Sequence, residues 1–100
     1  MGGNMIPAAV EIGSSVIFQK LKDEIVVLNM ENQRYYGLDD VGASMWELLL
    51  EEGSIAVASE KLRDMYHVDA ATLRADLEGF VGKLLAVGLL QERRQAAPTV

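Results

Sequence analysis

The chain has 100 residues, of which 50% are apolar and 24% are charged, and this composition is typical of one compact domain, not of a disordered tail or two domains. It contains no cysteine, which excludes disulfides, thiol catalysis and cysteine-ligated zinc or iron–sulfur sites. Its formal net charge of −6 disfavours nucleic-acid binding, because phosphate backbones are normally bound by clustered Lys and Arg.

The sequence shows no targeting or membrane segment. Residues 1–15 lack the basic region followed by an apolar core that a signal peptide requires. The longest apolar tract, residues 80–90, is interrupted by Lys83 and is too short to cross a bilayer. We therefore expect a cytoplasmic protein without a membrane partner.

Three strands are expected after a loosely ordered lead-in over residues 1–14. Residues 15–21 and 24–28 are rich in β-branched and aromatic side chains and are separated by a polar break. A turn, in which Asn32 can take a left-handed conformation, then leads to a third strand over Arg34–Leu38. Because side chains alternate along a strand, Tyr36 and Leu38 are expected to face the core of this antiparallel meander, away from Tyr35.

Three helices follow the strands. Asp39 or Asp40 is expected to cap the first helix, Ser54 the second and Asp69 the third, and Gly53 is expected to end the first. Apolar residues at helical spacing predict the buried faces, which are Val41, Met45, Trp46, Leu48 and Leu49 in the first helix, Ile55, Ala58, Leu62 and Met65 in the second, and Leu73, Leu77, Phe80, Leu84 and Leu85 in the third. The second helix should end near residues 66–67 and the third near residue 88. The predicted fold class is α+β, with a three-stranded antiparallel sheet followed by three helices and a frayed tail over residues 92–100.

A strip of small residues runs along the third expected helix, beside its apolar face. Its members are Ala75, Gly79, Gly82 and Ala86. Two interior glycines cost roughly 1 kcal/mol each relative to alanine, so the strip requires a reason. One reason is close packing against another element of the same domain. The other is a groove low enough for a second backbone to approach, bordered by Thr72, Asp76, Phe80 and Lys83.

The sequence offers no catalytic or metal-binding constellation. His67 is the single histidine, and it lies in a polar segment before Asp69. Without a cysteine or a second histidine, the chain cannot assemble a nucleophile–base pair or a nitrogen-rich metal site. Neither a phosphate-binding loop nor a dinucleotide fingerprint is present. We therefore expect a protein that is not an enzyme and that uses neither a cofactor nor a metal.

Two segments resemble the PqqD-like family, whose members are also called RiPP recognition elements. The segments are LNMENQRYYGLDDVGASMWELLL, residues 28–50, and AATLRADLEGFVGKLLAVGLL, residues 70–90. The resemblance extends over about residues 16–90, and the family often places glycine where this chain has Gln33. The motif YYGLDDVGASMWELL is similar to the corresponding segment of the standalone proteins of lasso-peptide pathways.

The resemblance implies a winged-helix-like domain, over residues 15–91, that binds the leader segment of a ribosomally made precursor peptide. In such domains the leader adds as a further strand to the edge of the third strand, beside the third helix, and the peptide is presented to a leader peptidase or another modifying enzyme. Carried over to this chain, the peptide-binding residues are Arg34, Tyr35, Tyr36, Gly37, Leu38, Thr72, Asp76, Gly79, Phe80 and Lys83.

Two other functions fit the same order of elements. A winged-helix regulator would use the third helix to read DNA, although the acidic charge of the chain opposes this. A structural or dimerisation subunit would use the free strand edge and the small-residue strip to meet a second copy.

Overall fold

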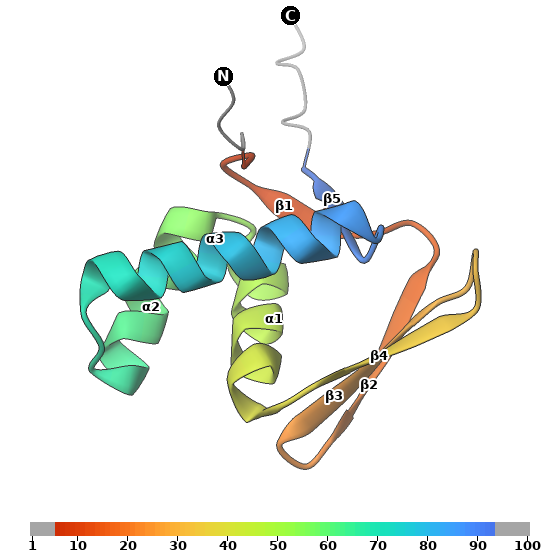
Figure 1. Ribbon diagram of the computed structural model, residues 1–100, viewed down its shortest axis with the longest axis horizontal. Coiled ribbons are helices and arrows are strands. Elements are labelled where there is room, and N and C mark those ends of the chain that lie inside the picture. The colour runs from red at the N-terminus through yellow and green to blue at the C-terminus, as the bar shows by residue number, and fades with distance from the viewer. Residues whose placement is uncertain (1–5, 94–100) are drawn as a thin grey trace, which may run out of the picture.

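The computed structural model describes residues 6–93, so parts of the expected lead-in and tail, residues 1–5 and 94–100, lie outside the described residues. In the described part, the elements follow in the order β1 (Val10–Ile12), β2 (Val16–Leu21), β3 (Glu24–Asn29), β4 (Arg34–Leu38), α1 (Asp40–Glu52), α2 (Ile55–Tyr66), α3 (Ala70–Ala86) and β5 (Leu90–Glu92) (Figure 1). None of the three helices in this range has the length and apolar composition that a bilayer crossing requires.

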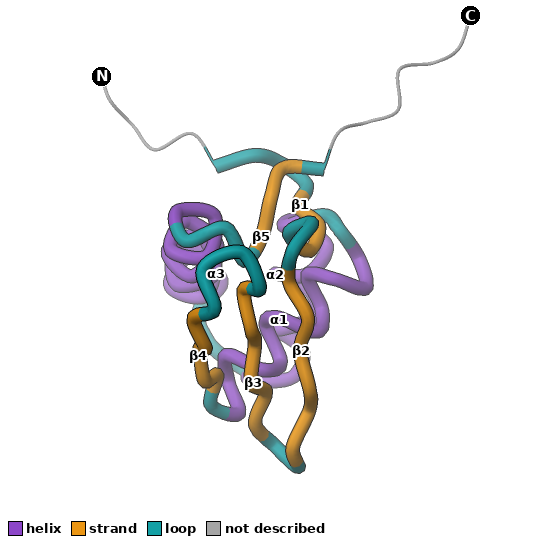
Figure 2. Tube along the Cα trace, turned by 90° about the vertical axis from the view of Figure 1, so that its right-hand side faces the viewer, coloured by secondary structure: helices purple, strands orange, loops and turns teal. Residues whose placement is uncertain are grey.

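The main sheet is antiparallel and has the strand order β2-β3-β4, which confirms the predicted α+β fold. Ile25 on the central strand pairs with Lys20 on β2 and with Leu38 on β4. Figure 2 shows the sheet in front of α1, with β4 at the edge on the same side as α3. Next to α3 the sheet therefore ends in a strand that, within the part of the chain that the structure describes, has a neighbour on one side only.

The core lies between this sheet and the helices. Trp46 of α1 is fully buried, and its ring meets Phe18 of β2 edge to face, with ring centroids 5.5 Å apart. Its indole Nε1 has no hydrogen-bond partner among the described residues. Tyr36 and Leu38 pack against the core from β4, as the strand alternation predicts. The other buried apolar side chains come mainly from β3 and the three helices, among them Val27, Leu49, Ile55, Leu62, Leu77, Val81 and Leu84.

The helix boundaries follow from local capping. Asp39, Ser54 and Asp69 are the N-caps, and each side chain accepts a hydrogen bond from the backbone N–H three residues later, at donor–acceptor distances between 2.8 and 3.2 Å. Gly53 ends α1 with a φ of 74°. His67 ends α2 in the left-handed conformation. The caps identified from the sequence are thus confirmed, with Asp39 as the first.

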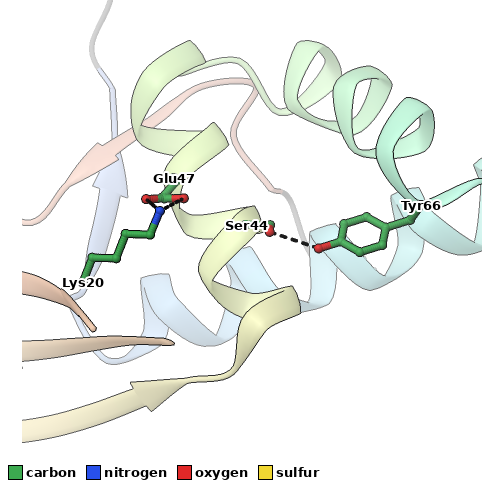
Figure 3. Close-up of polar contacts among 4 residues, drawn as sticks. All are labelled: Lys20, Ser44, Glu47 and Tyr66. Carbon is green, nitrogen blue, oxygen red and sulfur yellow. Dashed lines mark hydrogen bonds and ion pairs between the residues drawn. The ribbon is translucent and has the colours of Figure 1, made fainter. Parts of the chain in front are cut away.

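Three polar contacts join α1 to its neighbours: Lys61 of α2 pairs with Glu52, and Figure 3 shows the other two. The Lys20 Nζ of β2 lies 3.1 Å from the Glu47 Oε2 of α1. The Tyr66 hydroxyl, from the last turn of α2, donates to the Ser44 Oγ at 3.0 Å. Tyr66 therefore takes the inward position at the end of α2, and the neighbouring Met65, expected in the core, is 53% exposed.

The expectation of a loosely ordered lead-in is wrong for residues 10–12. These residues form β1, which pairs antiparallel with β5, so that Val10 lies opposite Glu92 and Ile12 opposite Leu90. Val10 is 1% exposed, and its N–H donates to the Gly53 carbonyl at 2.9 Å. The two three-residue strands join the ends of the domain, and the predicted tail likewise begins inside β5.

Three further expectations at single residues are wrong. In the turn between β3 and β4 the residue with positive φ, 60°, is Gln33, while the Asn32 side chain accepts from the Arg34 N–H at 3.0 Å. Val41 is 41% exposed because it lies in the first turn of α1, beside a groove described below. Val81, which was not expected in the core, is fully buried.

Candidate functional site

The unpaired edge of β4 is the first component of the candidate site. Among residues 6–93, β4 is hydrogen-bonded to β3 alone, so every second residue of its five directs its N–H and C=O away from the sheet. Tyr36 and Leu38 point toward the core, whereas Tyr35 lies on the opposite face and is 71% exposed. A short edge of this kind can accept another extended chain.

A groove of about 630 Å³ opens between the end of β4, the start of α1 and the middle of α3. We call it the central groove, and its lining residues are Gly37, Leu38, Asp39, Val41, Gly42, Met45, Ala75, Asp76, Gly79, Phe80 and Lys83. Its walls come from segments about forty residues apart in the chain. The exposure of Val41, on the otherwise apolar face of α1, is explained by this position.

Glycines give the central groove its shape. A Cβ atom built on Gly37 or on Gly79 would have no other atom within 4 Å, so both positions border open space. A Cβ atom on Gly42 would instead lie 3.4 Å from the Leu38 Cβ and 3.6 Å from the Phe80 Cε1. Gly42 at the start of α1 therefore lies directly against Phe80 of α3, while Gly37 and Gly79 leave the space beside that contact open.

The two glycines of the small-residue strip have different explanations. Gly79 faces open space, as a groove requires. A Cβ on Gly82 would lie 3.6 Å from the Ile6 Cδ1, so Gly82 packs against the segment that precedes β1. All four residues of the strip also line a further groove of about 700 Å³ beside Ile6, so close packing and open space both occur along the strip.

The charges of the central groove are Asp39, Asp76 and Lys83. The Asp39 carboxylate accepts the Gly42 N–H at 2.8 Å and serves as the cap of α1. In the part of the chain that the structure describes, neither Asp76 nor Lys83 forms an ion pair. The apolar groove thus carries one acidic and one basic side chain that are available to a ligand.

A second groove, of about 520 Å³, lies at the other end of β4, next to the end of α3. We call it the polar groove, and its lining residues are Asn29, Glu31, Asn32, Arg34, Tyr36, Leu85, Ala86, Val87 and Gly88. β4 contributes to both grooves, with Arg34 and Tyr36 in the polar one and Gly37 and Leu38 in the central one. An extended peptide laid along β4 would pass both.

The structure places most of the expected peptide-binding residues along these two grooves. Six of them line the central groove, namely Gly37, Leu38, Asp76, Gly79, Phe80 and Lys83, and two line the polar groove, namely Arg34 and Tyr36. Tyr35 and Thr72 line neither. Thr72 lies in the first turn of α3, where its N–H donates to the Asp69 carboxylate.

Several groove residues were not among the expected ones. Val41 and Met45 of α1 were assigned to the core from their helical spacing, and Ala75 only to the small-residue strip. The polar groove was not anticipated, because the end of α3 meets the turn between β3 and β4 through tertiary packing alone. Residues 6–93 contain no group of His, Cys, Asp and Glu side chains placed to hold a metal ion.

Comparisons with known proteins identify a family and two solved structures of similar fold. Residues 24–90 match the family described as coenzyme PQQ synthesis protein D, PqqD. The solved structure "TbiB1 in Complex with the TbiA(beta) Leader Peptide" is 30% identical, with a TM-score of 0.79 over 85% of this chain and 99% of that chain. "Lasso peptide synthetase B1 complexed with the leader peptide" is 21% identical, with a TM-score of 0.76 over 84% and 99%, and shares the fold. No curated protein sequence matches the chain.

Proposed function

The chain belongs to the PqqD family, and on this premise we propose that it binds the leader segment of a ribosomally made precursor peptide as an additional strand on β4. The observation that carries the proposal is the free edge of β4 beside the open central groove. In this proposal the protein performs no chemistry. It acts in the cytoplasm, within a lasso-peptide pathway, and presents the peptide to a leader peptidase or another modifying enzyme.

Strand pairing alone is too weak to hold a peptide. About four hydrogen bonds to the β4 edge would contribute a net ~1 kcal/mol each. Fixing the backbones of about six leader residues costs roughly 6–12 kcal/mol. The leader therefore requires side chains that become buried on binding.

The central groove supplies the places for such side chains. Each apolar leader side chain that becomes buried would contribute about 1.5–3 kcal/mol, so two or three anchors offset much of the ordering cost. Leu38, Met45 and Phe80 provide the apolar surface for these anchors. Asp76 and Lys83 lie on the same groove, and we propose that they select the register of the leader.

Titration with leader peptides tests the proposal. We expect the leader of a precursor encoded beside the gene for this protein to bind with micromolar or tighter affinity, as measured by calorimetry. A scrambled peptide of the same composition is the control, because it keeps charge and hydropathy but loses the order of the anchors. The proposal would be overturned if both peptides bound equally well or if neither peptide bound.

A further inference from the structure

Asn29, the last residue of β3, is a buried amide that the proposed binding mode does not explain. It is 5% exposed, and within residues 6–93 it is the only polar or charged side chain that is buried. Burying an amide is unfavourable unless its donor and its acceptor both find partners. The partners of Asn29 therefore indicate why the amide is there.

Both ends of the Asn29 amide are engaged, and the partners belong to different elements. Its Nδ2 donates to the Val87 carbonyl at 3.2 Å, immediately after α3, where a helix leaves its last carbonyls without partners. Its Oδ1 accepts the Glu31 N–H at 3.0 Å, in the turn that leads to β4. One side chain thus ties the end of α3 to the turn before β4.

These two partners are also the two walls of the polar groove. Glu31 and the start of β4 form one wall, and the end of α3 forms the other. Gly88 has a φ of 79°, and a Cβ atom there would lie 3.4 Å from the Asn29 Nδ2, so the turn after α3 leaves room for the amide. Toward the other end of β4, α3 has a second attachment, the contact of Phe80 with Gly42. The central groove opens beside that second attachment.

We infer that Asn29 is a positioning residue, which fixes the separation between β4 and the end of α3 and thereby sets the affinity for the leader. The inference rests on the proposed function. A leader strand on β4 must fit between β4 and α3. If the separation between these two elements varies, only some of the conformations of the protein can accept the leader. Binding then requires the matching conformation to be selected first.

The chemistry of the site specifies an amide. At neutral pH an aspartate at position 29 accepts the Glu31 N–H but has no hydrogen to donate to the Val87 carbonyl. A protonated aspartic acid can do both. Asn29→Asp should therefore weaken leader binding at neutral pH and recover affinity in acid, whereas Asn29→Ala should not recover. Glu31, Arg34, Asp39, Asp76 and Lys83 also face the grooves, so the wild type, titrated over the same pH range, corrects for their protonation.

The experiment compares Asn29→Ala and Asn29→Asp with Leu62→Ala. Leu62 is fully buried in α2 and lines neither groove, so this variant is destabilised without a change at the site. At a temperature where all variants are folded by circular dichroism, we expect leader Kd to rise at least about tenfold in both Asn29 variants at neutral pH, the equivalent of roughly 1.4 kcal/mol, and to stay unchanged in Leu62→Ala. An equal rise in leader Kd in all three variants would show that Asn29 acts only through stability, and it would overturn the inference.

A measurement without any peptide separates this inference from the proposed function. The chain has no cysteine, so thiols introduced by Tyr35→Cys on β4 and Ala86→Cys at the end of α3 can be spin-labelled selectively. We expect the distance distribution between the two labels to be broader in Asn29→Asp than in the wild-type background at neutral pH, and to narrow in acid. An unchanged distribution would overturn the inference even if the leader binds. Failure of the wild type to bind any leader, with a broadened distribution in the variant, would instead overturn the proposed function.

Discussion

At the scale of single residues, the central groove is defined by side chains that are missing as much as by those that are present. Gly79 lies inside α3, where glycine costs roughly 1 kcal/mol relative to alanine, and no packing contact in the described structure compensates for it. Gly82, one turn further, packs on Ile6 and has a structural reason. Of the two glycines, Gly79 is therefore the better position at which to test the function of the groove.

Gly79→Leu should block peptide binding and leave the domain folded. Among the described residues, a Cβ at this position meets no atom within 4 Å beyond the adjacent helix backbone, so the new side chain starts into open space, and the helix gains up to about 1 kcal/mol. We expect leader affinity to fall at least about tenfold by calorimetry, with an unchanged or higher thermal midpoint.

Two variants control this experiment. Gly79→Ala makes the same gain in helix propensity with a small side chain and should retain most of the affinity. Ala71→Leu adds the same bulk to an exposed position of α3 that lines neither groove. Undiminished binding by Gly79→Leu would show that the leader does not pass over Gly79, which lines both the central groove and the groove beside Ile6.

Asp76→Ala tests the role of charge in the same groove. Asp76 is exposed and has no ion pair among the described residues, so its removal should change stability by less than about 0.5 kcal/mol. We expect leader Kd to rise about three- to tenfold through the loss of one polar contact. Asp64→Ala, an equal change in charge on α2, should leave Kd unchanged. A similar loss in both variants would point to the overall field of the protein instead of a contact in the groove.

At the scale of elements, β4 has two roles: it contributes to the core, and it offers a free backbone edge to a peptide. Its inner side chains, Tyr36 and Leu38, pack against the core and fix the strand in place. Its outer backbone groups have no partner in the sheet. The packing therefore pre-orders the strand edge, which reduces the entropy that a peptide must offset when it pairs with it.

Backbone pairing predicts a specific sensitivity to amide methylation of the ligand. Each N-methylated leader amide on the pairing edge removes a donor worth a net ~1 kcal/mol and adds a methyl group where the strands meet. We expect Kd to rise severalfold or more per modified amide that faces β4. Methylation of an amide on the far edge of the leader should have little effect. In the protein, hydrogen exchange should slow on leader binding at alternate amides of Arg34–Leu38. A uniform response to methylation along the leader would exclude strand addition.

The elements that could be predicted from the sequence are those that local rules specify. Asp39, Ser54 and Asp69 cap helices through contacts three residues away, and the alternation of Tyr36 and Leu38 sets the inner face of β4. β1 and β5 were not predicted, because a strand of three residues is too short to show a period and because the two strands pair across about eighty residues of sequence. The distance between β4 and α3 was also beyond prediction, because the contacts found there, Asn29 with Val87 and Gly42 with Phe80, join residues far apart in the sequence.

At the scale of the whole molecule, the charge distribution distinguishes a peptide-binding protein from a DNA-binding one with a similar order of elements. The net charge is −6, and within α3 the basic Arg74 is paired with Glu78 at 2.9 Å. Duplex DNA binding depends on releasing counterions from phosphates that Lys and Arg neutralise. An acidic protein whose third helix has no net basic stripe lacks the means to do so.

We therefore predict that this protein does not shift duplex DNA in a gel assay, even at a salt concentration of about 50 mM, where electrostatic binding is stronger than at physiological salt. Leader binding should persist when the salt concentration is raised several-fold, because apolar burial and backbone hydrogen bonds are screened little by ions. The same protein sample, titrated with leader in the same buffer, controls for loss of folding. A DNA shift that weakens steeply with added salt would contradict the prediction and favour a regulator whose third helix contacts DNA, since a phosphate-dominated interface has that signature.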